Sequence, residues 1–241
     1  MWRDVVDLRN FYASSTGYIA RRMIWTQIRQ LWPNLIGQSV LGIGYATPYL
    51  GSFHKEASRT LALMPASQRA LPWPPHSSSL TTLSEESELP FADLSMDRIL
   101  LVHGLEFSDH ARSMMREIWR VLADGGRLLV VVPNRHGIWA RFERTPFGHG
   151  SPYTTSQLSR LLSENMFTPM ETSRALFVPP TTSKVLLSSA SAWEKLGLRW
   201  FPTFAGVILI EATKQIYAVA STTPERRRSY VPISDGISQR N

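Results

Sequence analysis

Residues Val40–Leu50 read Val-Leu-Gly-Ile-Gly-Tyr-Ala-Thr-Pro-Tyr-Leu, and this stretch decides the fold. It predicts a short buried strand, a glycine turn at Gly44 and the first turn of a helix. Glycine lets a ligand approach the backbone closely, and the first turn of a helix has free N–H groups. The stretch therefore predicts a pocket for a nucleotide-like ligand, with an ordinary tight turn as the alternative.

Working outward, strands and helices alternate along the chain, which is typical of a parallel sheet covered on both faces. Hydrophobic periodicity predicts helices over 5–31 (interrupted at Gly17), 47–53, 108–122, 154–165 and 190–196, and strands over 39–43, 59–64, 80–83, 96–102, 127–132, 175–178 and 206–212. We expect an α/β fold with a doubly wound, mostly parallel Rossmann-like sheet and helices on both faces.

The chain divides into three expected parts. Residues 1–34 predict a helical lid or appendage, 35–220 the main domain, and 221–241 a basic tail that is predicted to be disordered. With 241 residues, the chain is long enough for one large core.

Composition excludes several kinds of site. The chain has no cysteine, which rules out disulfides and thiolate ligands, and its six histidines lack metal-ligand spacing, so we predict no metal. No apolar run approaches the ~20 residues of a membrane helix, and the N-terminus lacks the apolar segment of a secretory signal. We therefore expect no membrane span and a cytoplasmic location.

The net charge of +7 bears on partners. Part of the excess lies in Arg21–Arg22 and Arg226–Arg228. A basic surface of this kind favours nucleic acid or another anionic partner, whereas a solvated face with a charged tail is the plainer interpretation.

Four segments in order carry a family resemblance. Val40–Leu50 is followed by Leu89–Leu101 (LPFADLSMDRILL), by His103–Phe107 (HGLEF) and by Arg120–Leu128 (RVLADGGRL). This series resembles the class I S-adenosylmethionine-dependent methyltransferases, in particular the methyltransferase type 11 branch. The residues alone indicate only a doubly wound ligand-binding domain, and the methyl donor comes from the resemblance.

The resemblance implies S-adenosyl-L-methionine as cofactor and direct in-line methyl transfer to an acceptor, a small molecule or a protein, that the sequence does not identify. Ligands of open α/β sheets lie at the carboxyl ends of the strands, where strand order reverses. The cofactor-binding residues implied there are Gly42, Gly44, Tyr45, Ala46, Met64, Pro65, Glu88, Leu89 and His103. Glu85, Glu86 and Glu88 are all candidates for the adenine contact.

The chain departs from the family pattern at the donor site. Gly42 stands where the family usually has an acidic residue, and residues 62–68 contain no carboxylate where the family usually has one for the ribose. The donor motif is therefore degenerate.

His103 is the candidate catalytic residue, because it follows a strand at the carboxyl end of the sheet and could act as a base; a structural histidine is the alternative. Glu106 matches a family position that is usually structural. Candidate substrate-binding residues are Tyr12, in the lid, and Phe147, His149 and Tyr153, in a loop after a strand; packing is the alternative for each.

Three functions remain open from the sequence. The first is a methyltransferase acting on an unidentified acceptor. The second is a non-catalytic interaction or regulatory protein that keeps the fold, which the missing carboxylates favour. The third is a nucleic-acid-associated member of the fold that uses the basic surface. The oligomeric state is not determined by the sequence.

Overall fold

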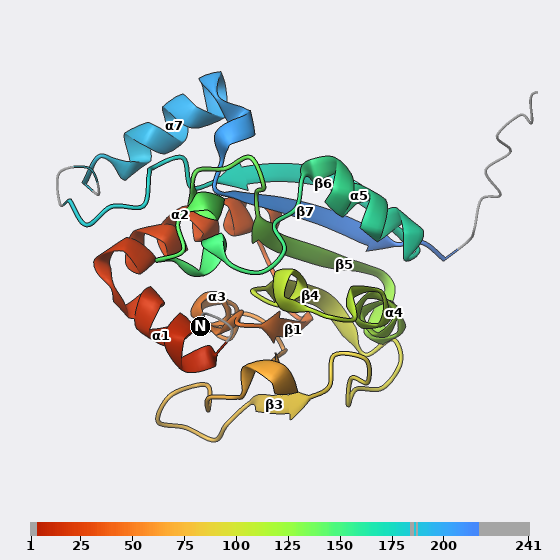
Figure 1. Cartoon of the computed structure of the whole chain (residues 1–241). Helices are drawn as coiled ribbons and strands as arrows, with labels where there is room; N and C mark the ends of the chain where they lie inside the picture. The colour runs from red at the N-terminus through yellow and green to blue at the C-terminus, as the bar shows by residue number, and fades with distance from the viewer. Residues whose placement is uncertain (1–3, 184–185, 187, 217–241) are drawn as a thin grey trace, which may run out of the picture.

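A single seven-stranded sheet organises the molecule in the computed structural model, which describes residues 4–183, 186 and 188–216. The strands lie in the order β3-β2-β1-β4-β5-β7-β6 (Figure 1). Their bounds are β1 Ser39–Gly44, β2 Arg59–Pro65, β3 Thr81–Ser84, β4 Met96–Val102, β5 Leu122–Pro133, β6 Phe167–Ala175 and β7 Val207–Lys214. Strands β1 to β5 pair in parallel, and β7 is antiparallel to both β5 and β6. The predicted doubly wound, mostly parallel sheet is confirmed.

Helices cover both faces of the sheet. They are α1 Val5–Ala13, α2 Ser15–Leu31, α3 Thr47–Phe53, α4 Ala111–Val121, α5 Thr155–Glu164 and α7 Ala190–Trp200. Five short 3-10 turns complete the described elements: η1 Ala66–Gln68, η2 Leu105–Phe107, η3 Trp139–Arg141, η4 Pro146–Gly148 and η5 Pro202–Phe204. Buried residues of α1, α2 and α3 form one core cluster with the sheet, and those of α4 and α5 form another.

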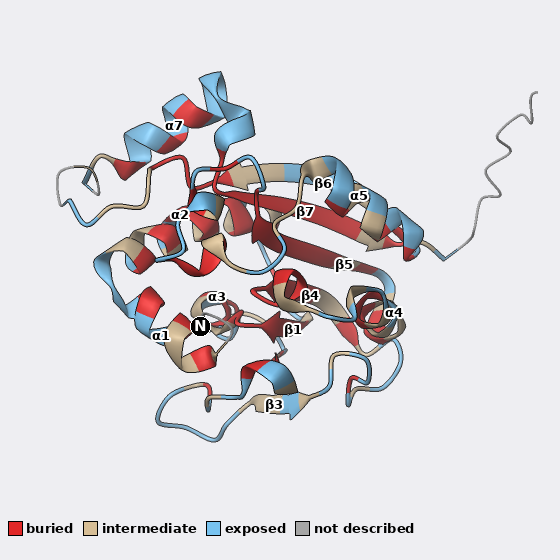
Figure 2. Ribbon diagram, viewed as in Figure 1, coloured by how far each residue is buried: buried red, intermediate tan, exposed pale blue. Residues whose placement is uncertain are grey.

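The core follows from strand alternation, because successive side chains point to opposite faces. Val40 and Leu100 face α1–α3, whereas Leu41 and Leu101 face α4 and α5. Both faces are covered, so the central strands are buried along most of their length (Figure 2).

The break between the first two helices differs from the prediction at Gly17. The chain breaks at Ser14 instead, whose side chain accepts a hydrogen bond from the Gly17 N–H and caps α2. Gly17 lies inside α2. A side chain does not fit at this position, because a Cβ there would stand 2.0 Å from the Phe11 carbonyl oxygen. Glycine thus allows the close approach of the two helices rather than interrupting one.

The strand predicted over 175–178 is also wrong. The strand β6 ends at Ala175, and Leu176 turns the chain with a φ of 66°. Residues 176–178 are apolar because they are buried in the core, not because they pair with another strand. The predicted tail over 221–241 lies outside the described residues.

Candidate functional site

The glycine turn after β1 is held against the end of β4. Gly44 has a φ of 76°, and a Cβ there would lie 2.3 Å from the Val102 carbonyl oxygen. The Tyr45 N–H donates to that same oxygen at 2.8 Å. Strand order reverses between β1 and β4, so this turn lies at the switch point where open α/β sheets bind ligands.

Leu50 fills the space beside Gly42. A Cβ at Gly42 would lie 2.7 Å from Leu50 Cδ1 and 2.8 Å from the Ala46 Cβ. An acidic side chain at position 42 would therefore begin in space that the side chains of Leu50 and Ala46 already occupy.

His103, the residue after β4, is strained and buried. Its φ of 50° lies in the left-handed region that non-glycine residues rarely adopt, and only 1% of its surface is exposed. Strained backbone of this kind persists where the surroundings impose it, and it clusters at functional sites. The Gln68 side chain donates to the His103 carbonyl oxygen and helps to hold this conformation.

Both ring nitrogens of His103 have partners. Nδ1 lies 3.0 Å from Glu106 Oε1, and Nε2 lies 2.7 Å from the Tyr12 hydroxyl. A carboxylate accepts only, so the Nδ1–H donates to Glu106 and the lone pair of Nε2 accepts from Tyr12; this tautomer is assigned from the partners. Glu106 Oε2 has no partner among the described residues. A buried carboxylate that orients a histidine in this way leaves Nε2 able to accept a proton.

Aromatic side chains close the space around this pair. The Tyr12 hydroxyl also lies 3.1 Å from that of Tyr49, and the Phe147 ring centroid lies 5.0 Å from that of His103. Burial raises the pKa of Tyr12 and of Tyr49 well above the usual value, so both stay protonated. We refer to Tyr12, Tyr49, His103, Glu106 and Phe147 as the aromatic–histidine cluster.

The loop after β5 completes the wall of the cluster. The Ser151 N–H donates to the Glu106 carbonyl oxygen at 2.8 Å, and Gly150 approaches the same carbonyl. His149 turns elsewhere, with Nε2 2.7 Å from the Glu143 carbonyl oxygen. Tyr153 packs against the core on the α4–α5 side.

The other predicted cofactor residues lie along the ends of β2 and β3. Met64 and Pro65 end β2 and are buried, as is Leu89. Among the acidic candidates, Glu86 Oε1 accepts from the Ser108 hydroxyl and the His110 N–H, whereas Glu85 and Glu88 are exposed.

Sequence reasoning did not select Tyr49 and gave Glu106 no catalytic role. The signal for Glu106 was its spacing of three residues from His103, which brings the two side chains together within one turn. Tyr49 lies on the buried side of α3 like any core residue. Its contact with the Tyr12 hydroxyl depends on how α1 packs beside α3, which the sequence does not show.

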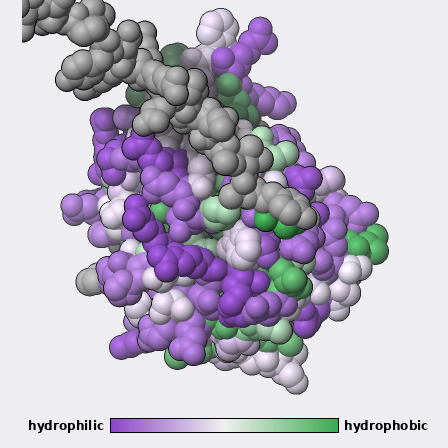
Figure 3. All heavy atoms as spheres, turned by 90° about the vertical axis from the view of Figure 1, so that its right-hand side faces the viewer, coloured by the Kyte–Doolittle hydropathy of each residue, from purple (hydrophilic) through white to green (hydrophobic). Residues whose placement is uncertain are grey.

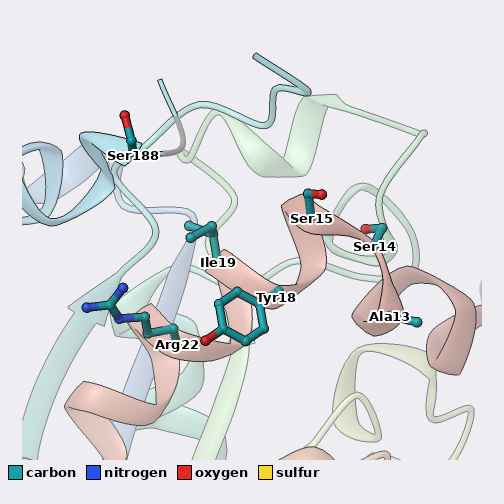
Figure 4. A pocket seen from close by; sticks show the side chains of 7 residues that line it. All are labelled: Ala13, Ser14, Ser15, Tyr18, Ile19, Arg22 and Ser188. Carbon is teal, nitrogen blue, oxygen red and sulfur yellow. The ribbon is translucent and has the colours of Figure 1, made fainter. Parts of the chain in front are cut away.

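Two surface hollows lie near α1. One of about 600 Å³ is lined in part by Phe11, Phe142, Arg144 and Thr181, and the Phe11 ring also contacts that of Phe147. The other, of about 490 Å³, lies beside Tyr18 and Arg22 (Figure 4). Neither is lined by Gly44, Tyr45 or His103.

The described residues contain neither a membrane-spanning helix nor a metal-ligand cluster. No helix among them is both long and apolar enough to cross a membrane. No group of three or more metal-ligating side chains was found within that same part of the chain.

Comparison with known proteins supports the fold. A family model described as a methyltransferase domain matches residues 40–130, which run from β1 into β5 and contain the glycine turn, Tyr49, His103 and Glu106. The other two members of the cluster, Tyr12 and Phe147, lie outside the matched residues. A methyltransferase of Thermotoga maritima, described as S-adenosylmethionine-dependent and as a possible histamine N-methyltransferase, superposes with a TM-score of 0.65 at 17% identity, over 89% of this chain and 97% of that one. This chain has the class I S-adenosylmethionine-dependent methyltransferase fold.

Three further proteins are similar to this chain, two of them solved structures. A proposed methyltransferase of Haloferax volcanii, in complex with the Trm112 methyltransferase activator, is 14% identical over 88% of this chain and 98% of its own, with a TM-score of 0.62. The cyclase SpnF is 16% identical over 82% of each chain, with a TM-score of 0.55. An uncharacterised protein of Mycobacterium tuberculosis is 26% identical over 224 residues, covering 89% of this chain and 74% of that protein.

The fit of the methyl donor can be tested against the cluster. Gly44 and Tyr45 are fully enclosed by the protein's own groups, and Tyr12 from α1 stands on the His103 ring nitrogen. The Tyr12 ring contacts both the Tyr45 ring and the His103 ring, so a donor placed between the turn and His103 would meet this side chain. The turn and Nε2 would fit a donor with Tyr12 displaced.

Proposed function

We propose that this protein is an S-adenosylmethionine-dependent methyltransferase in which His103 is the general base and α1 closes the site between turnovers. The observation that carries the proposal is the strained, buried His103. Its Nδ1 contacts Glu106, and its Nε2 contacts the Tyr12 hydroxyl, which α1 can carry away. Apolar residues would stabilise this edge of the sheet more, because they leave no buried polar atom unpaired. A buried polar pair at the ligand-binding edge therefore favours a role in catalysis.

The cofactor would supply an electrophilic methyl group. The residues proposed to hold it are Gly42, Gly44, Tyr45, Ala46, Met64, Pro65, Glu88, Leu89 and His103. Support for this cofactor comes from the family-model match over 40–130 and from the fold.

His103 and Glu106 define what the acceptor must be. Glu106 holds the imidazole in one tautomer, so Nε2 takes a proton from the attacking group. An acceptor that needs this help carries an O–H or N–H at the reacting atom. In this proposal the acceptor sits against Phe147, in the space that Tyr12 leaves when α1 opens, with His149 and Tyr153 on the neighbouring loop. We also propose that the protein works in the cytoplasm.

Calorimetry with S-adenosylmethionine tests the proposal. We expect the wild-type chain to bind, and Tyr12→Ala to bind several-fold more tightly because the closed arrangement competes with the donor. Tyr18→Ala is the matched control, since Tyr18 lies on the neighbouring helix and is 52% exposed. Absence of binding by both wild type and Tyr12→Ala at high donor concentration would reject the proposal.

A second function, a non-catalytic methyltransferase-fold protein, is favoured by one specific observation. Leu50 occupies the space beside Gly42 where the family usually places a carboxylate. Under this alternative the cluster is a permanent plug, and neither chain in the calorimetry binds the donor. Nucleic-acid binding through the basic surface stays a separate prediction, which retention of labelled tRNA or duplex DNA at low salt would support.

A further inference from the structure

The exposed side of α7 carries an unusual set of apolar side chains. Trp193, Leu196 and Trp200 recur three and four residues apart, so they form one stripe along the helix. Phe201 and Phe204 extend the stripe past the end of the helix. The exposed fractions are 41% for Trp193, 56% for Leu196, 65% for Trp200, 61% for Phe201 and 52% for Phe204. We call these five residues the aromatic face.

A neighbouring side of α7 anchors the helix to the protein. The Glu194 carboxylate accepts from the Phe177 N–H at 2.8 Å, and Gly197 packs directly on the Phe177 ring. Ala190 is buried in the core beneath α1–α3. Because these contacts use a different side of the helix, the five side chains of the aromatic face are left exposed, and most of α7 is exposed (Figure 2).

The side that carries α4 and α5 is largely hydrophilic, with isolated hydrophobic spots (Figure 3). Single exposed apolar side chains need no explanation, whereas a contiguous patch marks an interaction surface.

The charges around the aromatic face indicate what covers it. Within residues 188–206, the exposed charged side chains are Lys195 and Arg199, and the one acidic side chain, Glu194, is buried. Arg199 also lies 5.9 Å from the Trp200 ring centroid. Arg22 of α2 and Ser188, just before α7, line one hollow (Figure 4). A cationic rim around tryptophan and phenylalanine is the composition of helices that lie flat in the interface of an anionic membrane.

We propose that α7 and η5 form a docking surface for an anionic lipid membrane. The tryptophan and phenylalanine rings enter the boundary between headgroups and acyl chains, while Lys195 and Arg199 contact the phosphates. The proposed contact is peripheral, since no helix of the described residues is long and apolar enough to cross a membrane.

Co-sedimentation of the full chain with lipid vesicles tests this surface. We expect binding to phosphatidylcholine vesicles that contain phosphatidylglycerol, and about tenfold weaker binding to phosphatidylcholine alone. The variant Trp193→Ser/Trp200→Ser/Phe204→Ser should lose about tenfold or more of the binding, because interfacial affinity scales with buried apolar area. The matched control is Ile36→Ser/Leu83→Ser/Met170→Ser, which removes exposed apolar side chains elsewhere and should bind like the wild type.

A charge variant separates attraction from insertion. The variant Lys195→Glu/Arg199→Glu should lose the preference for anionic vesicles. The control Arg116→Glu/Arg160→Glu carries its substitutions on α4 and α5 and has the same net charge as that variant, but it should retain the preference. Circular dichroism of every variant establishes that the fold is intact. Residues 217–241 are present in all of them, so their charge contributes equally.

Three results would overturn the proposal. The first is no vesicle binding by the wild type. The second is unchanged binding by the triple serine variant. The third is a lipid-free dimer in light scattering that the triple serine variant converts to a monomer, because a second copy of the chain would then be what covers the aromatic face.

Discussion

The two faces of the sheet are built from different kinds of residue. Side chains that face α4 and α5 are almost entirely apolar, including Leu41, Ile43, Leu63, Ile99, Leu101, Leu128, Val130, Val132, Ile208 and Ile210. The face under α1–α3 uses the alternate positions of the same strands, yet it also holds buried or half-buried polar groups: Thr60, Arg98, Arg127 and Glu211.

Two of the polar groups on the α1–α3 face, Arg127 and Glu211, are paired with each other. On the polar face the Glu211 carboxylate accepts from Trp32 Nε1 at 2.8 Å and from Arg127 at 2.7 Å, and burial lowers the pKa of the nearby Arg98. Burial of charged groups is costly even when they are paired, so such a face is not the most stable solution. We infer that the α1–α3 face gives up part of its stability to these polar groups, whereas the α4–α5 face is built for packing alone.

Truncation in the apolar face should give the largest effect on stability. Ile118 is fully buried between α4 and the sheet, and Ile118→Ala should lower the free energy of unfolding by about 4 kcal/mol because it leaves a cavity. Urea unfolding measures this change, and Ile36→Ala, at an exposed position, is the control. Donor affinity of the folded variant should be unchanged; a parallel loss of affinity would show that the two faces are not separable.

The ionisable group that attaches α7 should give the next largest effect, and it should depend on pH. Burial raises the pKa of Glu194 to about 7, so the folded chain holds this proton more tightly than the unfolded chain. The stability that the proton contributes is complete below the unfolded pKa near 4.5 and is lost as the pH rises through 7.

Glu194→Gln removes that titration while keeping an oxygen that accepts from Phe177. Relative to the wild type, the variant should gain up to about 3 kcal/mol in unfolding free energy between pH 5 and 8, a difference that unfolding curves at each pH measure. A stability difference that stays constant across this range would contradict the burial of an ionisable carboxyl.

How far the sequence predicts the molecule also differs between the faces. Around α4 and α5 the predictions are close: the strand over 96–102 has the predicted ends, and the helix predicted over 154–165 is α5, which a capping box of Thr154 and Gln157 begins. Local signals suffice there because apolar runs and caps belong to single elements. The edge strand β6 was missed because its residues 168–174 are mostly polar, include Pro169 and pair only through β7.

The site is less predictable because its contacts join distant parts of the chain. The position of His103 follows from the strand that precedes it, and sequence reasoning selected it. Its two partners illustrate the limit: Glu106 is local, whereas Tyr12 is 91 residues away and arrives on a helix that the sequence marks only as a lid. The plugging of the space beside Gly42 by Leu50 is likewise a matter of packing, which no motif records.

Restoring the usual acidic residue at Gly42 tests that packing. Gly42→Asp should lower the unfolding free energy by about 2 kcal/mol, because its Cβ meets Leu50 and Ala46 in a filled space. Made in a Leu50→Ala background, the same change should cost about 1 kcal/mol less, and the double-mutant cycle measures this coupling. Equal costs in the two backgrounds would mean that Leu50 is not what excludes the acid.

The smallest expected effect on stability comes from the group that closes the site. Tyr12→Phe removes one hydroxyl that contacts both Tyr49 and His103, at a cost of about 1 kcal/mol in unfolding free energy. The ring remains, so its packing against the Tyr45 ring is kept and only the polar contact to Nε2 is lost. If α1 is a gate, this small loss should weaken the closed arrangement and tighten donor binding by about the same free energy, since both report one equilibrium. If the cluster is instead a permanent plug, unfolding curves will shift and calorimetry will not, and the polar face of the sheet will then have to be explained without a ligand.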